Sequence, residues 1–265
     1  MKHHVVFHDL KNTIKRINIA FILAWYDIKL RYRRTRLGLI WISITVLIES
    51  FILSMVFSHL FHERFIDYYP YVFSGRVSWQ FIAGILGESI KAVPGAKNYI
   101  LNHNIPPPVF ILRICLRNFL IFMHSSIFVL AVCCLNGINV WFYGVVFILP
   151  MMALWLIFLL FPFALILSIL GARYRDIIFL MPYCMQILFY LTPIVWKSKN
   201  LSGSFAHFLA FNPFAYMIEM MRDIFFYSML DYLHLVHLLM FSFVGWIVAF
   251  FMYASTHKKL CYWML

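Results

Sequence analysis

Long apolar runs are the feature that most constrains how this chain can fold. Crossing the hydrocarbon core of a bilayer takes about 17 to 25 apolar residues in a helix. The chain has six runs of this kind, at 37–61, 71–90, 109–135, 142–170, 177–196 and 232–254. We therefore predict an all-α integral membrane protein with about six transmembrane helices.

The composition agrees with this interpretation. Apolar residues make up 64% of the chain and charged residues only 12%, whereas a soluble domain is near half apolar and about a quarter charged. The fourth and fifth runs contain no charged residue, and the second, with Arg76 and Glu88, is the least apolar in character. Prolines inside several runs are compatible with membrane helices, because neighbouring helices satisfy the freed carbonyl groups.

The basic residues predict the orientation of the bundle. Of the 22 Lys and Arg residues, seventeen fall before Leu37, in the second and fourth connections or in the tail, and five fall on the other side. Short loops rich in Lys and Arg stay in the cytoplasm, so both termini are expected there. The net charge of +12 is thus explained by topology, and no nucleic-acid partner is expected, since the clusters adjoin membrane runs.

Residues 1–36 are expected to form a cytoplasmic interface segment, and residues 37–265 the transmembrane domain. Ile14, Ile17, Phe21 and Ile28, with Ala24 or Trp25, recur at three- and four-residue steps, which indicates an amphipathic helix. Such a helix lies in the membrane interface, with its apolar face in the lipid and its lysines near anionic head groups.

A basic run follows this helix and consists of Arg31, Arg33, Arg34 and Arg36. By itself such a run is an orientation signal beside a span. Arginine also pairs bidentately with phosphate. A second role, attracting the diphosphate of a lipid-linked glycan at the cytoplasmic mouth, is therefore a further hypothesis.

Two connections between the runs have structure of their own. The second holds a short polar helix around 96–104, ended by Pro106, Pro107 and Pro108, and it forms a rigid feature suited to docking a soluble partner. The outer loop, about 197–228, contains Asn212-Pro213, a helix start with a capping Asn. The helix after it carries Glu219, Arg222 and Asp223, which disfavour a seventh span and favour a helix in the outer interface.

The chain carries no recognisable catalytic motif. It has no Walker-type phosphate loop, no metalloprotease helix and no nucleophile elbow, so neither a metal site nor catalytic residues are expected. The cysteines have no metal-ligand spacing and are expected to pack between helices. Any ATP hydrolysis must therefore occur on another subunit, with ATP and magnesium bound there and no cofactor on this chain.

Glu49 is the carboxylate that lies deep within an otherwise clean span, and a charge inside the membrane is by default a functional hypothesis. A central acid costs roughly 3 kcal/mol to insert, which some twenty apolar neighbours outweigh. The alternative role is structural, fastening two helices, with His124, Glu88 or Arg76 as its partner.

Aromatic residues make up 20% of the chain. Many of them, such as Tyr68, Tyr69 and Tyr71, fit a belt at the membrane interface. Aromatic faces also pack against the apolar faces of sugar rings, so a conduit lined by them would let a polymer slide.

The segment LAWYDIKLRYRRTRLGLIW, residues 23 to 41, resembles the start of the first span in permeases of bacterial ABC exporters for O-antigen, capsular and teichoic polymers. Further similar segments follow in the same order: Ala172-Arg173-Tyr174-Arg175-Asp176, Leu191-Thr192-Pro193-Ile194 and Asn212-Pro213. The resemblance covers nearly the whole chain. One departure is Leu39, where family members often have proline.

The resemblance implies a homodimeric permease in the bacterial inner membrane, paired with two copies of a separate ATP-binding subunit and translocating a lipid-linked polysaccharide. It implies that the first and fifth spans line the conduit, and that the outer loop forms gate helices. The implied conduit residues are Trp41, Glu49, Phe51, Phe57, Tyr190 and Trp196. The implied ATPase-coupling residues are Ile14, Ile17, Phe21, Pro94, Lys97, Tyr99, Arg173, Arg175 and Asp176, and the implied gate residues are Asn212, Pro213, Glu219 and Arg222.

Two alternatives stay open on the sequence. A membrane-embedded transferase acting on lipid-linked sugars would use an acid or histidine such as Glu49 or His124. An exporter of drugs or small lipids would keep the architecture and change the cargo.

Overall fold

The computed structural model describes residues 2–33, 35–103, 105–138, 140, 142–197, 209, 211–226 and 232–264. Over these ranges the chain is almost wholly helical and contains no strand, which confirms the all-α prediction. The helices are α1 (Lys2–Lys15), α2 (Ile17–Tyr32), α3 (Ile40–Leu60), α4 (Phe65–Ser89), α5 (Ala92–Gly95), α6 (Lys97–His103), α7 (Pro108–Leu135), α8 (Leu149–Arg173), α9 (Ile177–Leu191), α11 (Pro213–Phe225) and α12 (Tyr232–Met264). A π-helical turn, Gly144–Ile148, leads directly into α8.

Within the described residues, four helical stretches are long and apolar enough to cross a bilayer: Ile40–Leu60, Pro108–Leu135, Gly144–Arg173 and Leu233–His257. They correspond to the first, third, fourth and sixth predicted runs. The chain is therefore a multi-pass membrane protein.

The second and fifth runs form helices of a different character. α4 has 25 residues, or about 37 Å at the usual helical rise, but it contains three charged side chains, Asp67, Arg76 and Glu88. α9 has 15 residues, or about 22 Å, and ends at Leu191, because Thr192 takes the extended conformation required before Pro193. The total of six spans stays a prediction.

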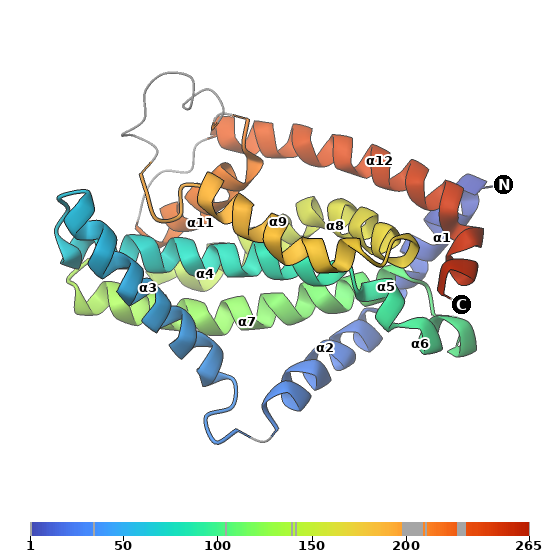
Figure 1. The fold of residues 1–265 in the computed structure, drawn as a ribbon, viewed down its shortest axis with the longest axis horizontal. Helices are drawn as coiled ribbons and strands as arrows, with labels where there is room; N and C mark the ends of the chain where they lie inside the picture. Colours follow the sequence, from blue (N-terminus) through green and yellow to red (C-terminus); the bar gives the residue numbers. More distant parts are fainter. Residues whose placement is uncertain are drawn as a thin grey trace.

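The helices form an elongated bundle (Figure 1). α4, α7 and α8 run side by side through its centre, α12 lies along α8, and α3 packs against the first part of α4. α1 and the end of α12 lie at the same end of the bundle as α5 and α6. This is the arrangement expected when both ends of a chain lie on one side of a membrane.

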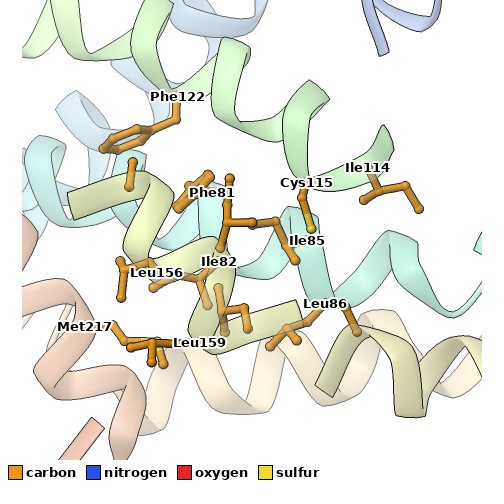
Figure 2. Packing of buried hydrophobic residues seen from close by; sticks show 14 of the residues in the cluster. Phe81, Ile82, Ile85, Leu86, Ile114, Cys115, Phe122, Leu156, Leu159 and Met217 are labelled. Atoms are coloured by element: carbon orange, nitrogen blue, oxygen red, sulfur yellow. The ribbon is translucent and has the colours of Figure 1, made fainter. Parts of the chain in front are cut away.

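α4 supplies the centre of the hydrophobic core. Figure 2 shows its side chains Phe81, Ile82, Ile85 and Leu86 packed among residues of three other helices. The partners labelled there are Ile114, Cys115 and Phe122 of α7, Leu156 and Leu159 of α8, and Met217 of α11. Cys115 is fully buried, as expected for a packing residue.

Small residues let two pairs of helices approach closely. The buried face of α3 carries Ser50, Ser54 and Ser58, so this helix meets α4 through hydroxyl-sized side chains. Where α8 passes the end of α4, Gly171 lies against the backbone carbonyl of Ile90, and a Cβ atom there would overlap it. Larger residues at these positions would force the helices apart.

The amino-terminal segment differs from the single amphipathic helix that the periodicity predicts. The helix is interrupted at Arg16, which separates α1 from α2. Ala20, Ala24 and Ile28 are buried where α2 packs on α7. Ala24 and Ile28 belong to the predicted apolar stripe, and its other members, Ile14, Ile17, Phe21 and Trp25, are exposed.

Candidate functional site

An ion pair joins the middle of α3 to the middle of α4. The Arg76 guanidinium donates from Nε and Nη2 to Oε1 of Glu49 at 3.0 and 2.9 Å, and from Nη2 to Oε2 at 2.8 Å. Of the three candidate partners of Glu49, the structure therefore selects Arg76. This bidentate geometry is the strong form of a charged hydrogen bond, and it offsets much of the cost of placing each charge within the membrane.

The ion pair lies in an open groove of about 430 Å³ between α3, α4 and α9. The groove is lined by Glu49, Arg76, Trp79, Gln80, Ala83, Gly84, Met185, Gln186, Phe189 and Tyr190. The Arg76 guanidinium lies over the Phe189 ring, 5.4 Å from its centroid. Aromatic faces, two amide side chains and one ion pair thus share a single surface, and this combination suits a polyhydroxylated ligand.

The structure brings together some of the predicted conduit residues and not others. Glu49 and Tyr190 both line the groove, and the Tyr190 side chain is 65% exposed. Trp41 and Phe51 are exposed elsewhere on α3, and Phe57 stacks on Phe61 near the end of that helix. Trp196 follows α9, where its indole N–H donates to the backbone carbonyl of Tyr190 at 3.3 Å.

A buried arginine holds the segment that follows α9. Arg222 of α11 is 5% exposed and donates to the carbonyls of Pro193 (3.3 and 3.4 Å) and Ile194 (3.2 Å). Its guanidinium lies 3.7 Å from the centroid of the Tyr71 ring and packs on Gly75, where a Cβ atom would overlap it. Arg222 therefore fixes residues 192–196 against α4.

Two tyrosines of α4, Tyr68 and Tyr71, also hold the segment that follows α9. The Tyr68 hydroxyl donates to the carbonyl of Val195, and that of Tyr71 donates to the carbonyl of Trp196 at 3.3 Å. Tyr68 is fully buried and Tyr69 is 8% exposed, so both rings pack inside the bundle, and their place in a belt at the membrane interface stays a prediction. The sequence signals aromatic residues near an interface but not the direction in which each one points.

The start of α11 follows the predicted capping pattern. Asn212 Oδ1 accepts from the backbone N–H of Phe214 at 3.0 Å, with Pro213 at the first helical position. The Asn212 amide also donates to the Thr192 hydroxyl at 3.2 Å. Glu219, further along α11, lies 3.9 Å from His234 of α12. The four predicted gate residues thus lie in or at the start of α11, and two of them, Asn212 and Arg222, contact the residues at the end of α9.

Three of the predicted coupling residues line a second groove, at the end of the bundle where α1 lies. This coupling groove has a volume of about 380 Å³ and is lined by Pro94, Lys97, Gly171, Ala172, Arg175, Ile178, Phe179 and Trp263. Arg173 lies over the rings of Tyr174 and Trp263, at 4.9 and 5.4 Å. The end of α12, which the sequence did not single out, is therefore part of this surface.

The other coupling candidates lie outside the groove. Tyr99 of α6 packs on Phe110, with ring centroids 5.9 Å apart, and Asp176 precedes α9 as an exposed residue. Ile14, Ile17 and Phe21 are 72%, 46% and 48% exposed on α1 and α2. These three apolar side chains form a separate exposed row.

The basic run is divided by the fold. Arg31 lies 3.2 Å from Glu88 of α4 and is part of a charged cluster between helices. Arg33 and Arg36 are exposed in the turn between α2 and α3. Arg34 lies outside the described residues.

A buried carboxylate fastens α1 to α12. Asp9 Oδ2 accepts from the Tyr253 hydroxyl at 2.8 Å and lies 3.2 Å from His257 Nε2. Burial acts to raise the pKa of the Asp9 carboxyl, but hydrogen bonds from His257 and Tyr253, together with the charges of His257 and His8, hold that pKa below its ordinary value of 3.8. The attachment therefore requires the ionised form.

We expect acid to release α1. A lowered pKa in the folded state means that ionised Asp9 stabilises the attachment above pH 3.8, and that this contribution is lost as the pH falls below that value. Hydrogen exchange of the α1 amides, corrected for the intrinsic exchange rate, should rise on acidification. Asp9→Asn should raise exchange at neutral pH and flatten the pH dependence, whereas an unchanged profile in this variant would contradict the assignment.

The sequence did not single out the polar groove residues Gln80 and Gln186, or the carboxylate of Asp27. The sequence could have indicated each of them as unusual. Gln80 and Gln186 are polar residues within long apolar runs, and Asp27 is the only acid in α2. Asp27 accepts from Nε of Arg113 at 2.7 Å and Nη1 of Arg117 at 3.3 Å. A lone polar residue in an apolar helix needs a partner, and the sequence alone does not say which.

Comparison with known proteins places these features in a family. Residues 20–226 match the family model of the ABC-2 type transporter. Two relatives from Klebsiella pneumoniae, both described as the O-antigen export system permease protein RfbA, are each 23% identical to this chain. One alignment covers 81% of this chain and 83% of the relative, and the other 87% and 89%. Because that model matches most of its length, the chain belongs to the ABC-2 type transporter family.

Proposed function

We propose that this chain is the membrane subunit of an ATP-driven exporter that moves a lipid-linked polysaccharide, of O-antigen or capsule type, outward across the inner membrane. The observation that carries the proposal is the groove between α3, α4 and α9. Its exposed aromatic ring, paired charges and two amides match the mixed apolar and hydroxylated surface of a sugar chain. The relatives' printed role in O-antigen export supports this choice of cargo.

The exposed apolar faces beside the groove support a homodimer. On α3, Phe51, Ile52 and Met55 are each between 44% and 57% exposed, and on α9, Tyr183 and Ile187 are 66% and 59% exposed. A second copy facing these helices would close the open side of the groove into a conduit. Lipid then covers the remaining apolar surface.

The coupling groove supports an ATPase partner, because the chain has no phosphate loop of its own and the family is one of ATP-driven transporters. A projecting apolar side chain of the partner would fit between Pro94 and Phe179, with Lys97 and Arg175 at the edge. Closure of two ATPase subunits on ATP would push on α5, α8 and the end of α12 together, since all three border this groove.

The proposal is tested by purifying the chain together with the product of a neighbouring ATPase gene. A stable complex is expected, with ATPase activity that rises when lipid-linked polysaccharide is added. A failure to form the complex, or an ATPase rate indifferent to the permease, would remove this function.

Within that complex, Tyr190→Ala should lower the polymer-stimulated ATPase rate by about two- to tenfold, the loss expected for one aromatic contact. The ATPase rate without polymer should stay unchanged, because Tyr190 does not line the coupling groove. Tyr143→Ala is the matched control, since Tyr143 is 71% exposed and lies outside the groove. Equal effects of the two variants would contradict a sugar contact at Tyr190.

A further inference from the structure

A second charged cavity lies at the junction of α2, α4 and α7. It has a volume of about 340 Å³. Its charged lining consists of Asp27, Arg31, Glu88, Lys91, Arg113 and Arg117. Of these residues, Arg31 was considered above, as part of the basic run.

The cavity contains more positive than negative charge. Four basic side chains face two carboxylates, and each carboxylate is already shared between two arginines. Arg113 and Arg117 both bind Asp27, while Arg31 and Arg117 both bind Glu88. The two acids therefore leave an excess of two positive charges.

Two of the basic side chains, Arg117 and Lys91, have N–H donors without an acceptor among the described residues. The side chain of Arg117 is 11% exposed, and its Nε is buried without an acceptor within the described part of the chain. Lys91 is exposed at the rim and forms no ion pair with any described residue. Buried arginine N–H groups normally have an acceptor, so these unused donors could bind an anion in the cavity.

The surface beside the cavity is apolar. Ile22, Tyr26 and Leu30 of α2 are 53%, 55% and 64% exposed, and their spacing of four residues places them in one row along the helix. The row ends beside Arg31. α2 thus contributes both charged residues to the cavity and an exposed apolar row, and together these have the two chemistries of an amphiphile.

We propose that this cavity binds the phosphate groups of a lipid head group, with the lipid tail lying along the exposed row of α2. The excess of two positive charges matches a dianion, and arginine presents paired N–H groups to phosphate oxygens. Naming the lipid as the polyprenyl diphosphate carrier of the exported glycan rests on the proposed function. The head-group site itself does not require it.

This assignment differs from the expectation based on the basic run. Arg33 and Arg36 are exposed in a turn, where water screens them. Arg31 contributes because it lines the cavity, where one of its neighbours is Glu88. Phosphate recognition therefore involves α4 and α7 as well as the turn.

The test uses the full-length chain in phosphatidylcholine nanodiscs that contain a small fraction of polyprenyl diphosphate, and it measures lipid retention by native mass spectrometry. Lys91→Gln should weaken retention by about tenfold, the effect of one charged hydrogen bond. Lys259→Gln is the matched control, because Lys259 is exposed near the same end of the bundle and does not line the cavity. Polyprenol, which has the tail without the phosphates, should not be retained.

A substitution of opposite sign guards against a simple loss of folding. Glu88→Gln raises the positive excess by one charge and should tighten retention, whereas damaged packing would weaken it. Equal retention by the wild type, Lys91→Gln and Glu88→Gln would overturn the site. Phosphatidylglycerol retained as well as the polyprenyl lipid, with the same response to both variants, would overturn the assignment to the carrier and support a site for ordinary membrane lipid.

A third measurement adds inorganic diphosphate to the buffer and tests whether it displaces the bound lipid. Competition with the bound lipid would support recognition of the phosphates rather than the tail. These measurements need no ATPase subunit. A failure here is therefore distinguishable from a failure of the exporter complex to form.

Discussion

Arg76→Gln is expected to abolish export while leaving Glu49 alone in the membrane. The pair is bidentate, with donor to acceptor distances of 2.8 to 3.0 Å. An unpaired acid at the centre of a span costs about 3 kcal/mol, which corresponds to roughly two orders of magnitude in the population of the correctly assembled bundle. The expected result is less protein in the membrane and a conduit whose α3 and α4 no longer keep their spacing.

The double variant Glu49→Gln/Arg76→Gln separates the two consequences. Removing both charges removes the cost of the unpaired acid, so the amount of membrane-inserted protein should recover. Export should recover only in part if the charges also contact the polymer. The measurements are quantitative immunoblotting of membranes and surface display of the polysaccharide.

An ion pair at the end of the bundle supplies the control. Lys197 lies 2.6 Å from Glu63, and both side chains are about one third exposed. A pair in partial contact with water contributes less than one at the centre of a span, so Glu63→Gln should lower export less than Arg76→Gln. Wild-type export by Arg76→Gln at normal protein levels would contradict a functional pair.

Arg222→Met is expected to release the segment that follows α9. The substitution keeps an apolar chain against Tyr71 but leaves the carbonyls of Pro193 and Ile194 without the donors they now have. Each buried acceptor left unpaired costs about 1 to 3 kcal/mol. Because this segment follows the groove helix α9 and is held by α11, export should fall at least tenfold on the same scale.

Hydrogen exchange of residues 192–197 measures the release directly. Exchange should rise strongly in Arg222→Met, and Gly75→Ala should give a similar rise, since its methyl group would take the space of the guanidinium. Arg64→Met is the matched control, because Arg64 forms only an exposed pair with Asp67 at the same end of the bundle. Unchanged exchange in Arg222→Met would show that other contacts hold the segment.

The apolar runs predicted the helices well, because hydrophobicity along the chain is a local property. Three of the residues predicted for ATPase coupling, Pro94, Lys97 and Arg175, line one groove, and their coupling role stays a prediction. The orientation of individual side chains was less predictable. Tyr68 is buried and the stripe from Ile14 to Phe21 is exposed, because the face a helix buries depends on neighbours distant in sequence.

The ion pairs show the same limit. Arg76 and Glu88 made the second run the least certain span, although each is compensated by a partner on another helix. The sequence offered three partners for Glu49 and no means of ranking them. Glu49 and Arg76 are 27 residues apart in sequence, so their pairing depends on how α3 packs against α4. The serines that allow this close packing do not indicate which charged residues will pair.

The length of α12 has a mechanical consequence. It runs for 33 residues without a proline, or about 50 Å, so it behaves as one stiff rod. Near its C-terminal end Trp263 packs against Arg173, and near its N-terminal end His234 and His237 pack against Tyr216 of α11. A tilt of α12 imposed at one end therefore displaces the residues at its other end.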